Sequence, residues 1–195
     1  VLTVTPLAIT VEIDYQSGTY GMTAEEMAAQ VKSHLREGSA LYSEDTESEV
    51  WSLSVLTKPA AGASPVSGTP NAGRYYICGK VESNNYSITF CGQEAEGGAY
   101  GAEHALFVLE KASVTISLAP KESGGDYLVY DGTGKEYKAS LKGQQIEIAF
   151  TISYYLTTEG EGAATEELPV NAGNYTVVAT ITDPTQADNY NIGSG

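Results

Sequence analysis

The motif Asn-Ala-Gly-x-Tyr occurs twice in this chain, at positions 71–75 and again at positions 171–175. Each copy is followed by a strand-like run and then by Asn-Tyr, which is Asn85-Tyr86 in the first case and Asn189-Tyr190 in the second. A motif that recurs at the spacing of a domain indicates two copies of one module rather than one large fold. The sequence therefore predicts two units in tandem.

The residue types within the motif predict a corner in the chain. Its asparagines are suited to hydrogen-bond the backbone of their own turn, and its glycines are expected to take a positive φ there. Its tyrosine then enters a strand, where the hydroxyl group can reach a backbone group at the corner and close the core. The residues of this predicted structural motif are Asn71, Gly73 and Tyr75, with their counterparts Asn171, Gly173 and Tyr175.

Most of the remaining chain has the alternating pattern of β-strands, and its 14 tyrosines favour strands over helices. Aligning Val1-Leu2 with Val108-Leu109 places Leu7 on Val114 and defines the unit boundaries. We expect residues 1–6 to be the last strand of a preceding module, in a fragment of a longer protein. Residues 7–111 would form a first β module, and residues 112–195 a second one that ends before its last strand. The linkers are short enough to hold the modules stiffly.

One segment instead has the pattern of a helix. Thr23 and Glu26 have the spacing of a capping box, and Met22 and Met27 stand at the positions of a hydrophobic staple. Apolar residues continue at helical spacing as far as Leu35. We expect a helix over about residues 23–36, packed by its apolar face on a sheet, in an otherwise all-β fold.

The two cysteines flank a predicted hairpin. If Asn84-Asn85 form a two-residue turn, Cys78 lies opposite Cys91 in a non-hydrogen-bonded pair, where the Cα atoms come closest. That geometry permits a disulfide, and an extracellular location would favour it. The alternative is a pair of reduced cysteines in the core.

Charge and motif spacing argue against several classes of function. The net charge of −15 repels nucleic-acid phosphates and anionic membranes, so neither is an expected partner. His34 and His104 lie in no recognisable catalytic motif. The segment 132–135 lacks the spacing of a phosphate-binding loop, and the acidic segment 44–49 lacks that of an EF-hand. We expect no enzyme activity and no cofactor or metal site.

The order of the motifs resembles that of the MBG repeats, immunoglobulin-like β modules of bacterial surface and secreted proteins. Proline, Asn-Ala-Gly-x-Tyr, a strand and Asn-Tyr follow one another in both units. The segments 2–7 and 18–21 are similar to the start of such a unit, and Tyr130-Asp131-Gly132 with Lys135 is similar to the entry of a related variant. The predicted helix departs from the pattern. The resemblance implies two tandem immunoglobulin-like β-sandwich modules, the first with one short helix insertion.

Family resemblance also implies an extracellular, cell-surface or secreted setting. We expect a non-catalytic spacer region that displays other domains, with neighbouring modules of the same chain as its partners. The alternative is an adhesin or carbohydrate-binding module that presents the outward members of Tyr75-Tyr76 and Tyr154-Tyr155 to a host glycan or surface protein. The expected state is a monomer, and an unpaired sheet edge would allow strand exchange between molecules.

Overall fold

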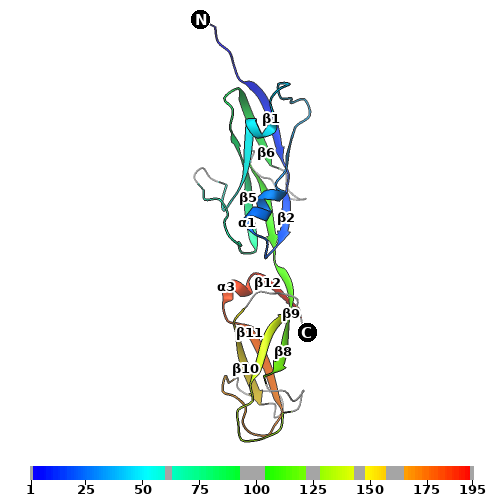
Figure 1. The fold of residues 1–195 in the computed structure, drawn as a ribbon, viewed down its shortest axis with the longest axis vertical. Coiled ribbons are helices and arrows are strands. Elements are labelled where there is room, and N and C mark those ends of the chain that lie inside the picture. Colours follow the sequence, from blue (N-terminus) through cyan, green and yellow to red (C-terminus); the bar gives the residue numbers. More distant parts are fainter. Residues whose placement is uncertain are drawn as a thin grey trace. The chain divides into compact units, whose positions relative to one another are not determined.

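The computed structural model describes residues 2–59, 63–92, 104–121, 128–142, 148–156 and 165–193. Strands make up most of its secondary structure (Figure 1), which confirms the predicted all-β class. The chain divides into two compact units, Val1–Lys111 and Ala112–Gly195. No helix in the described ranges combines the length and the apolar character that crossing a membrane requires.

The described residues of the first unit form two sheets. In one, β1 (Leu7–Ile13) lies between β3 (Ser33–Leu35), its antiparallel partner, and β6 (Tyr86–Gly92), its parallel partner. The other has the order β2-β7-β5-β4. It is built from β2 (Gln16–Thr19), β7 (His104–Glu110), β5 (Gly73–Val81) and β4 (Trp51–Leu56).

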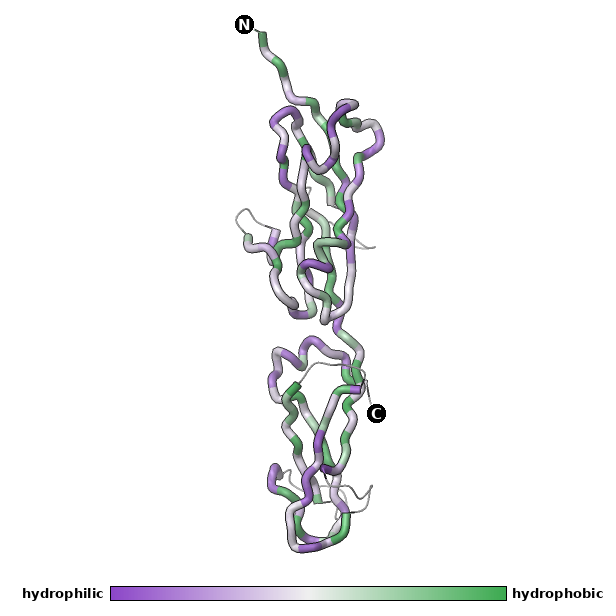
Figure 2. The backbone as a smooth tube through the Cα atoms, viewed as in Figure 1, coloured by the Kyte–Doolittle hydropathy of each residue, from purple (hydrophilic) through white to green (hydrophobic). Residues whose placement is uncertain are grey.

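Both sheets contribute side chains to one hydrophobic core. Successive strand residues point to opposite faces, so Ile9, Val11 and Ile13 of β1 share the buried face. The ring of Phe90 on β6 lies so close to Gly79 on β5 that a Cβ there would come within 2.4 Å of it. Figure 2 shows hydrophobic residues recurring along these strands. The other core residues are Met27, Val50, Trp51, Val55, Ile77, Tyr86, Ala105, Phe107 and Leu109.

The predicted helix is present but shorter than expected. In the capping box, the Glu26 backbone N–H donates to Thr23 Oγ1 at 3.2 Å, and the Thr23 N–H donates to Glu26 Oε2 at 2.7 Å. The helix α1 (Ala24–Gln30) then ends, and Ser33–Leu35 form the strand β3. Extending the helix to residue 36 was wrong because these residues instead gain backbone hydrogen bonds with β1. Apolar spacing alone does not reveal that competing partner.

The predicted hairpin between the cysteines is also wrong. Strands β5 and β6 lie in different sheets, so Cys78 pairs with Ser54 and His104, and Cys91 pairs with Glu12. Ile77 and Phe90 point into the core, so the neighbouring cysteines face away from it on opposite sheets. They form no disulfide.

The described residues of the second unit form a three-stranded sheet and a two-stranded sheet. The first has the order β12-β8-β9, from β12 (Tyr190–Gly193), β8 (Ala112–Pro120) and β9 (Tyr137–Lys142). The second pairs β10 (Phe150–Leu156) with β11 (Tyr175–Ile181) in antiparallel fashion. Two short helices complete the described elements: α2 (Glu47–Val50) in the first unit and α3 (Pro184–Ala187) in the second.

The two Asn-Tyr pairs occupy equivalent places in the two units. Tyr86 pairs with Leu7 in the parallel β1–β6 ladder, and Tyr190 pairs with Ala112 in the parallel β8–β12 ladder. This register makes Leu7 equivalent to Ala112. The sequence alignment of Leu7 with Val114 was therefore wrong by two positions, because apolar alternation is unchanged by a shift of two. Residues 2–6, expected to be a strand, form none.

Candidate functional site

The repeated motif forms the same corner in both units. The Tyr75 hydroxyl group donates a hydrogen bond to the Asn71 carbonyl oxygen at 2.6 Å, and Tyr175 donates to Asn171 at 3.1 Å. The predicted tyrosine corner is thereby confirmed. Burial raises the pKa of Tyr75, which keeps its hydroxyl proton in place as a donor.

The glycines of the motif differ between the units. Gly73 has a φ of +157°, at the edge of the region that L side chains rarely adopt. The positive φ predicted for Gly173 is not observed. Close packing explains the glycine at position 173, since a Cβ there would come within 3.0 Å of the Leu156 side chain.

A cavity of about 320 Å³ lies beside the corner of the second unit. Three segments form its wall: the turn that precedes β9, the first residue of β9, and the corner together with the start of β11. The lining residues are Leu128, Val129, Tyr130, Lys135, Tyr137, Pro169, Val170, Asn171, Ala172, Gly173, Asn174, Tyr175 and Val177.

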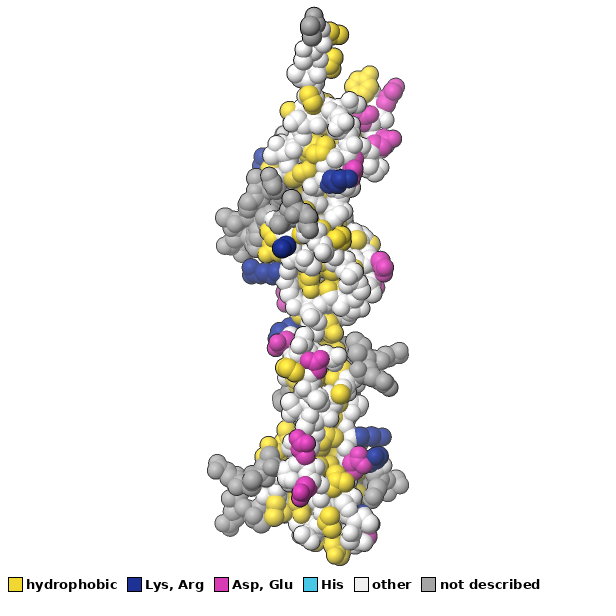
Figure 3. All heavy atoms as spheres, turned by 90° about the vertical axis from the view of Figure 1, so that its left-hand side faces the viewer, with side chains coloured by type: hydrophobic (Ala, Val, Ile, Leu, Met, Phe, Trp, Pro, Cys, Tyr) yellow, Lys and Arg dark blue, Asp and Glu magenta, His cyan; other side chains and the backbone are white. Residues whose placement is uncertain are grey.

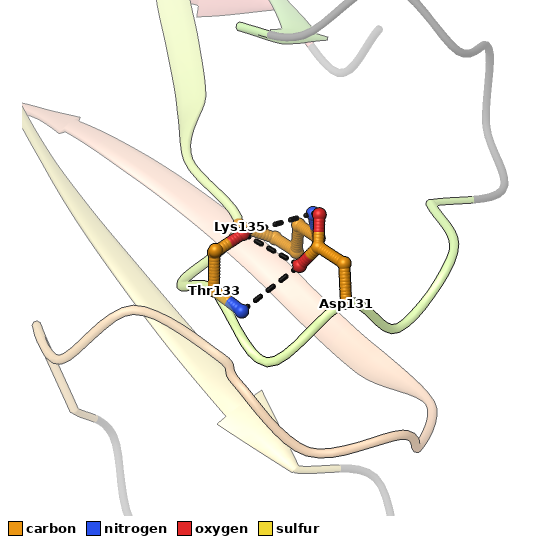
Figure 4. Close-up of polar contacts among 3 residues, drawn as sticks. All are labelled: Asp131, Thr133 and Lys135. Atoms are coloured by element: carbon orange, nitrogen blue, oxygen red, sulfur yellow. Dashed lines mark hydrogen bonds and ion pairs between the residues drawn. The ribbon is translucent and has the colours of Figure 1, made fainter.

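The turn that forms one wall is held by its own polar side chains (Figure 4). Asp131 accepts hydrogen bonds from the Thr133 N–H at 2.9 Å and the Thr133 hydroxyl at 2.6 Å, and from Lys135 Nζ at 2.7 Å. Gly132 between them takes a φ of +78°, which favours glycine. The ammonium group of Lys135 and the two Thr133 donors together hold the pKa of the Asp131 carboxyl far below its usual range. The lysine that borders the cavity is thus already paired with a carboxylate.

Backbone contacts fasten this turn to the corner segment. The Lys135 N–H donates to the Pro169 carbonyl oxygen at 2.9 Å, and a Cβ on Gly134 would come within 2.8 Å of Leu168 Cβ. In the first unit, the Ala24 N–H at the start of α1 donates to the Gly68 carbonyl oxygen at 2.8 Å. Helix α1 therefore makes the corresponding backbone contact to the segment before the corner of its own unit.

The cavity offers a guest polar and apolar surface in similar amounts. Aliphatic and tyrosine side chains dominate the lining, and its volume is at the lower end of the range for ligand pockets. The described residues that line the cavity include no histidine, cysteine or carboxylate that could act as a nucleophile or general base. Over the described residues of the whole chain, no group of three histidine, cysteine or acidic side chains could hold a metal ion.

The structure places the polar candidates from the sequence in ordinary structural roles. His34 lies on β3 rather than on a helix, and its ring faces Glu12 at 3.2 Å and Asp14 at 3.3 Å. In the acidic segment, Asp45 accepts a hydrogen bond from the Tyr86 hydroxyl group. Glu49 accepts from the Thr46 N–H and hydroxyl group at the start of α2. The side chain of His104 lies outside the described residues.

Of the two adjacent tyrosine pairs considered for glycan binding, only Tyr154-Tyr155 divides into a buried and a more exposed member. Tyr154 is buried, and its hydroxyl group accepts a hydrogen bond from the Tyr137 N–H at 3.1 Å. Its neighbour Tyr155 is half-buried, as are Tyr75 and Tyr76. The large exposed tyrosines in the described ranges are Tyr42 and Tyr130, neither of which belongs to an adjacent pair.

Sequence reasoning did not identify the cavity. Its lining includes the predicted corner residues Asn171, Gly173 and Tyr175, but Tyr137, Val170 and Val177 stood out in no motif. A comparison of the two units could have pointed to the cavity. In the first unit, a strand pattern at 106–109 follows the strand of the corner, whereas the sequence shows no such pattern after the corner strand of the second unit.

Comparisons with family models, with curated proteins and with solved structures find no match to this chain.

Proposed function

We propose that this chain is a non-catalytic spacer region of an extracellular bacterial surface or secreted protein. Its two units would be immunoglobulin-like β-sandwich modules that display or space other domains. The observation that carries the proposal is the repeated corner, in which a tyrosine hydroxyl group bonds the asparagine carbonyl four residues earlier in both units. Two units that share this structural feature suit a spacer, because repeating one unit is enough to set the length of a spacer.

The internal arrangement of the first unit supports the sandwich proposal. Its two sheets share one hydrophobic core, and the contact between Phe90 and Gly79 joins one sheet to the other. The parallel pairing of β1 with β6 places the first strand of the unit beside a later one. Tyrosine corners and two packed sheets are features of immunoglobulin-like domains.

Surface chemistry is consistent with this proposal. The face drawn in Figure 3 carries acidic side chains that are dispersed over it. Such a distribution favours solubility, and it offers neither nucleic acid nor an anionic membrane a site of complementary charge. The lack of a histidine or carboxylate in the cavity lining gives catalysis no support.

Surface display can test the spacer function directly. The chain would be placed between a cell-wall anchor and a small binding domain, and the accessibility of that domain to an antibody would be measured on whole cells. Deleting residues 7–111 should lower antibody access. Replacing them with an unrelated β module of similar length should restore it, because a spacer contributes length rather than recognition.

The rival function is adhesion or carbohydrate binding through outward tyrosines. It predicts saturable binding of the isolated chain to a glycan or host protein in an array, with loss of binding on Tyr76→Ala or Tyr155→Ala substitution. The spacer proposal predicts no retained ligand and unchanged antibody access in those variants. If the unrelated module failed to restore access while a specific glycan bound the chain, the spacer proposal would be abandoned.

A further inference from the structure

Two parallel ladders fasten the first two strands of the first unit. All seven residues of β1 pair with β6, and all four residues of β2 pair with β7. Each ladder is extended by a further backbone hydrogen bond. The Leu7 N–H donates to the Asn85 carbonyl oxygen at 2.9 Å, and the Tyr20 N–H donates to the Glu110 carbonyl oxygen at 2.7 Å. The strands that begin the unit are therefore bonded along their whole length to the strands that end it.

The direction of these ladders determines how they respond to tension along the chain. The chain enters the first unit at the end where β1 begins and leaves it toward β8 at the opposite end (Figure 1). Tension thus pulls β1 backward and β7 forward, in both cases along the strand. Because both ladders are parallel, this tension slides the paired strands along each other. Sliding loads the evenly spaced hydrogen bonds of a parallel ladder together rather than one after another.

Core packing opposes the same sliding motion. Ile9, Val11 and Ile13 of β1 are 4%, 0% and 0% exposed. A slip of β1 by one residue would turn these side chains to the outer face of the sheet. A slip by two residues would move each of them out of a closely packed site. Since no partial slip keeps both the hydrogen bonds and the packing, the β1–β6 ladder resists sliding as one unit.

We propose that the first unit is a load-bearing module, in which the β1–β6 ladder, followed along the chain by the β2–β7 ladder, keeps the unit folded under tension. Forced unfolding is governed by the unfolding rate rather than by the equilibrium free energy. Resistance to force therefore depends on the two ladders that the tension must break first. This property belongs to the first unit alone, so it and the proposed spacer function can fail separately.

Single-molecule force spectroscopy on the full chain, placed between two marker modules, tests the ladders. Unfolding of the first unit is recognised because residues 7–111 then extend by roughly 300 Å. Leu7→Pro removes the N–H that donates to Asn85, and Tyr20→Pro removes the one that donates to Glu110. Each should raise the unfolding rate at a fixed force about three- to tenfold. Leu7→Ala and Tyr20→Ala are the matched controls, which keep the N–H and should unfold more slowly than the proline variants.

A variant outside the loaded ladders separates mechanical resistance from general stability. The Val66 N–H donates to the Val55 carbonyl oxygen at 2.9 Å, on β4, the outermost strand in the described order β2-β7-β5-β4. Val66→Pro removes this bond and should unfold at lower urea than the parent chain. Its unfolding rate under force should stay at the parent value, because the loaded ladders are intact. If Val66→Pro accelerated forced unfolding as much as Leu7→Pro, the proposal would be overturned.

The direction of pulling provides a test that needs no proline. Asn84 is exposed and lies just before β6, beside the start of β1. In a chain with Cys78→Ala and Cys91→Ala, a handle on the thiol of Asn84→Cys and a second handle at the N-terminus would peel the β1–β6 ladder from one end. The force needed should be several-fold lower than when the same chain is pulled from its two ends. Equal forces in the two directions would overturn the proposal, even if Leu7→Pro failed to fold.

Discussion

At the scale of single residues, each corner tyrosine combines a half-buried ring with one directed hydrogen bond. Replacing Tyr75 or Tyr175 with phenylalanine keeps the ring and removes the bond to the carbonyl four residues earlier. We expect each change to lower the free energy of unfolding of its own unit by about 0.5–1.5 kcal/mol. Urea titration would measure the loss. Tyr130→Phe, at a side chain that is 61% exposed, is the control and should stay within about 0.5 kcal/mol of the parent chain.

Asp131 gives the second unit a defined response to acid. Since Lys135 and Thr133 lower the pKa of its carboxyl in the folded state, the interaction stabilises the unit at any pH above the unfolded-state value of about 3.9. Stability is lost only as the pH falls from there toward the lower folded-state pKa. Asp131→Asn should therefore unfold at a lower temperature than the parent near neutral pH, and the difference should shrink below about pH 4. A difference that persisted unchanged in acid would contradict this assignment.

At the scale of elements, the packing of sheet on sheet in the first unit depends on one residue without a side chain. A Cβ at position 79 would overlap the ring of Phe90. The backbones of β5 and β6 cannot move apart without disturbing the pairing of β5 with β4 and of β6 with β1. We expect Gly79→Ala to destabilise the unit by about 1–3 kcal/mol through overpacking. Adding Phe90→Leu should recover part of the loss. Gly193→Ala, whose Cβ would make only ordinary contacts, is the matched control in thermal unfolding measurements.

At the scale of the whole molecule, the two units differ in how much apolar surface their described residues bury. The large hydrophobic cluster lies in the first unit, whereas the second contributes fewer buried residues, among them Val114, Tyr154 and Ile181. Because burial is the main favourable term in folding, we expect the second unit to unfold at lower urea. Trp51, the single tryptophan, reports only on the first unit. Circular dichroism should begin to change before Trp51 fluorescence does, and coincident transitions would contradict the expectation.

The sequence by itself determined the features that depend on a few neighbouring residues. The tyrosine corner, the capping box of Thr23 and Glu26, and the all-β class all follow from local hydrogen-bond chemistry and side-chain alternation. Only the tertiary structure decided which distant segments meet. It separated Cys78 from Cys91, ended α1 at Gln30 in favour of β3, and shifted the alignment of the two units by two residues. It also revealed the cavity beside Tyr175, because strand partners are chosen by burial of residues far apart in sequence, and no local pattern encodes that choice.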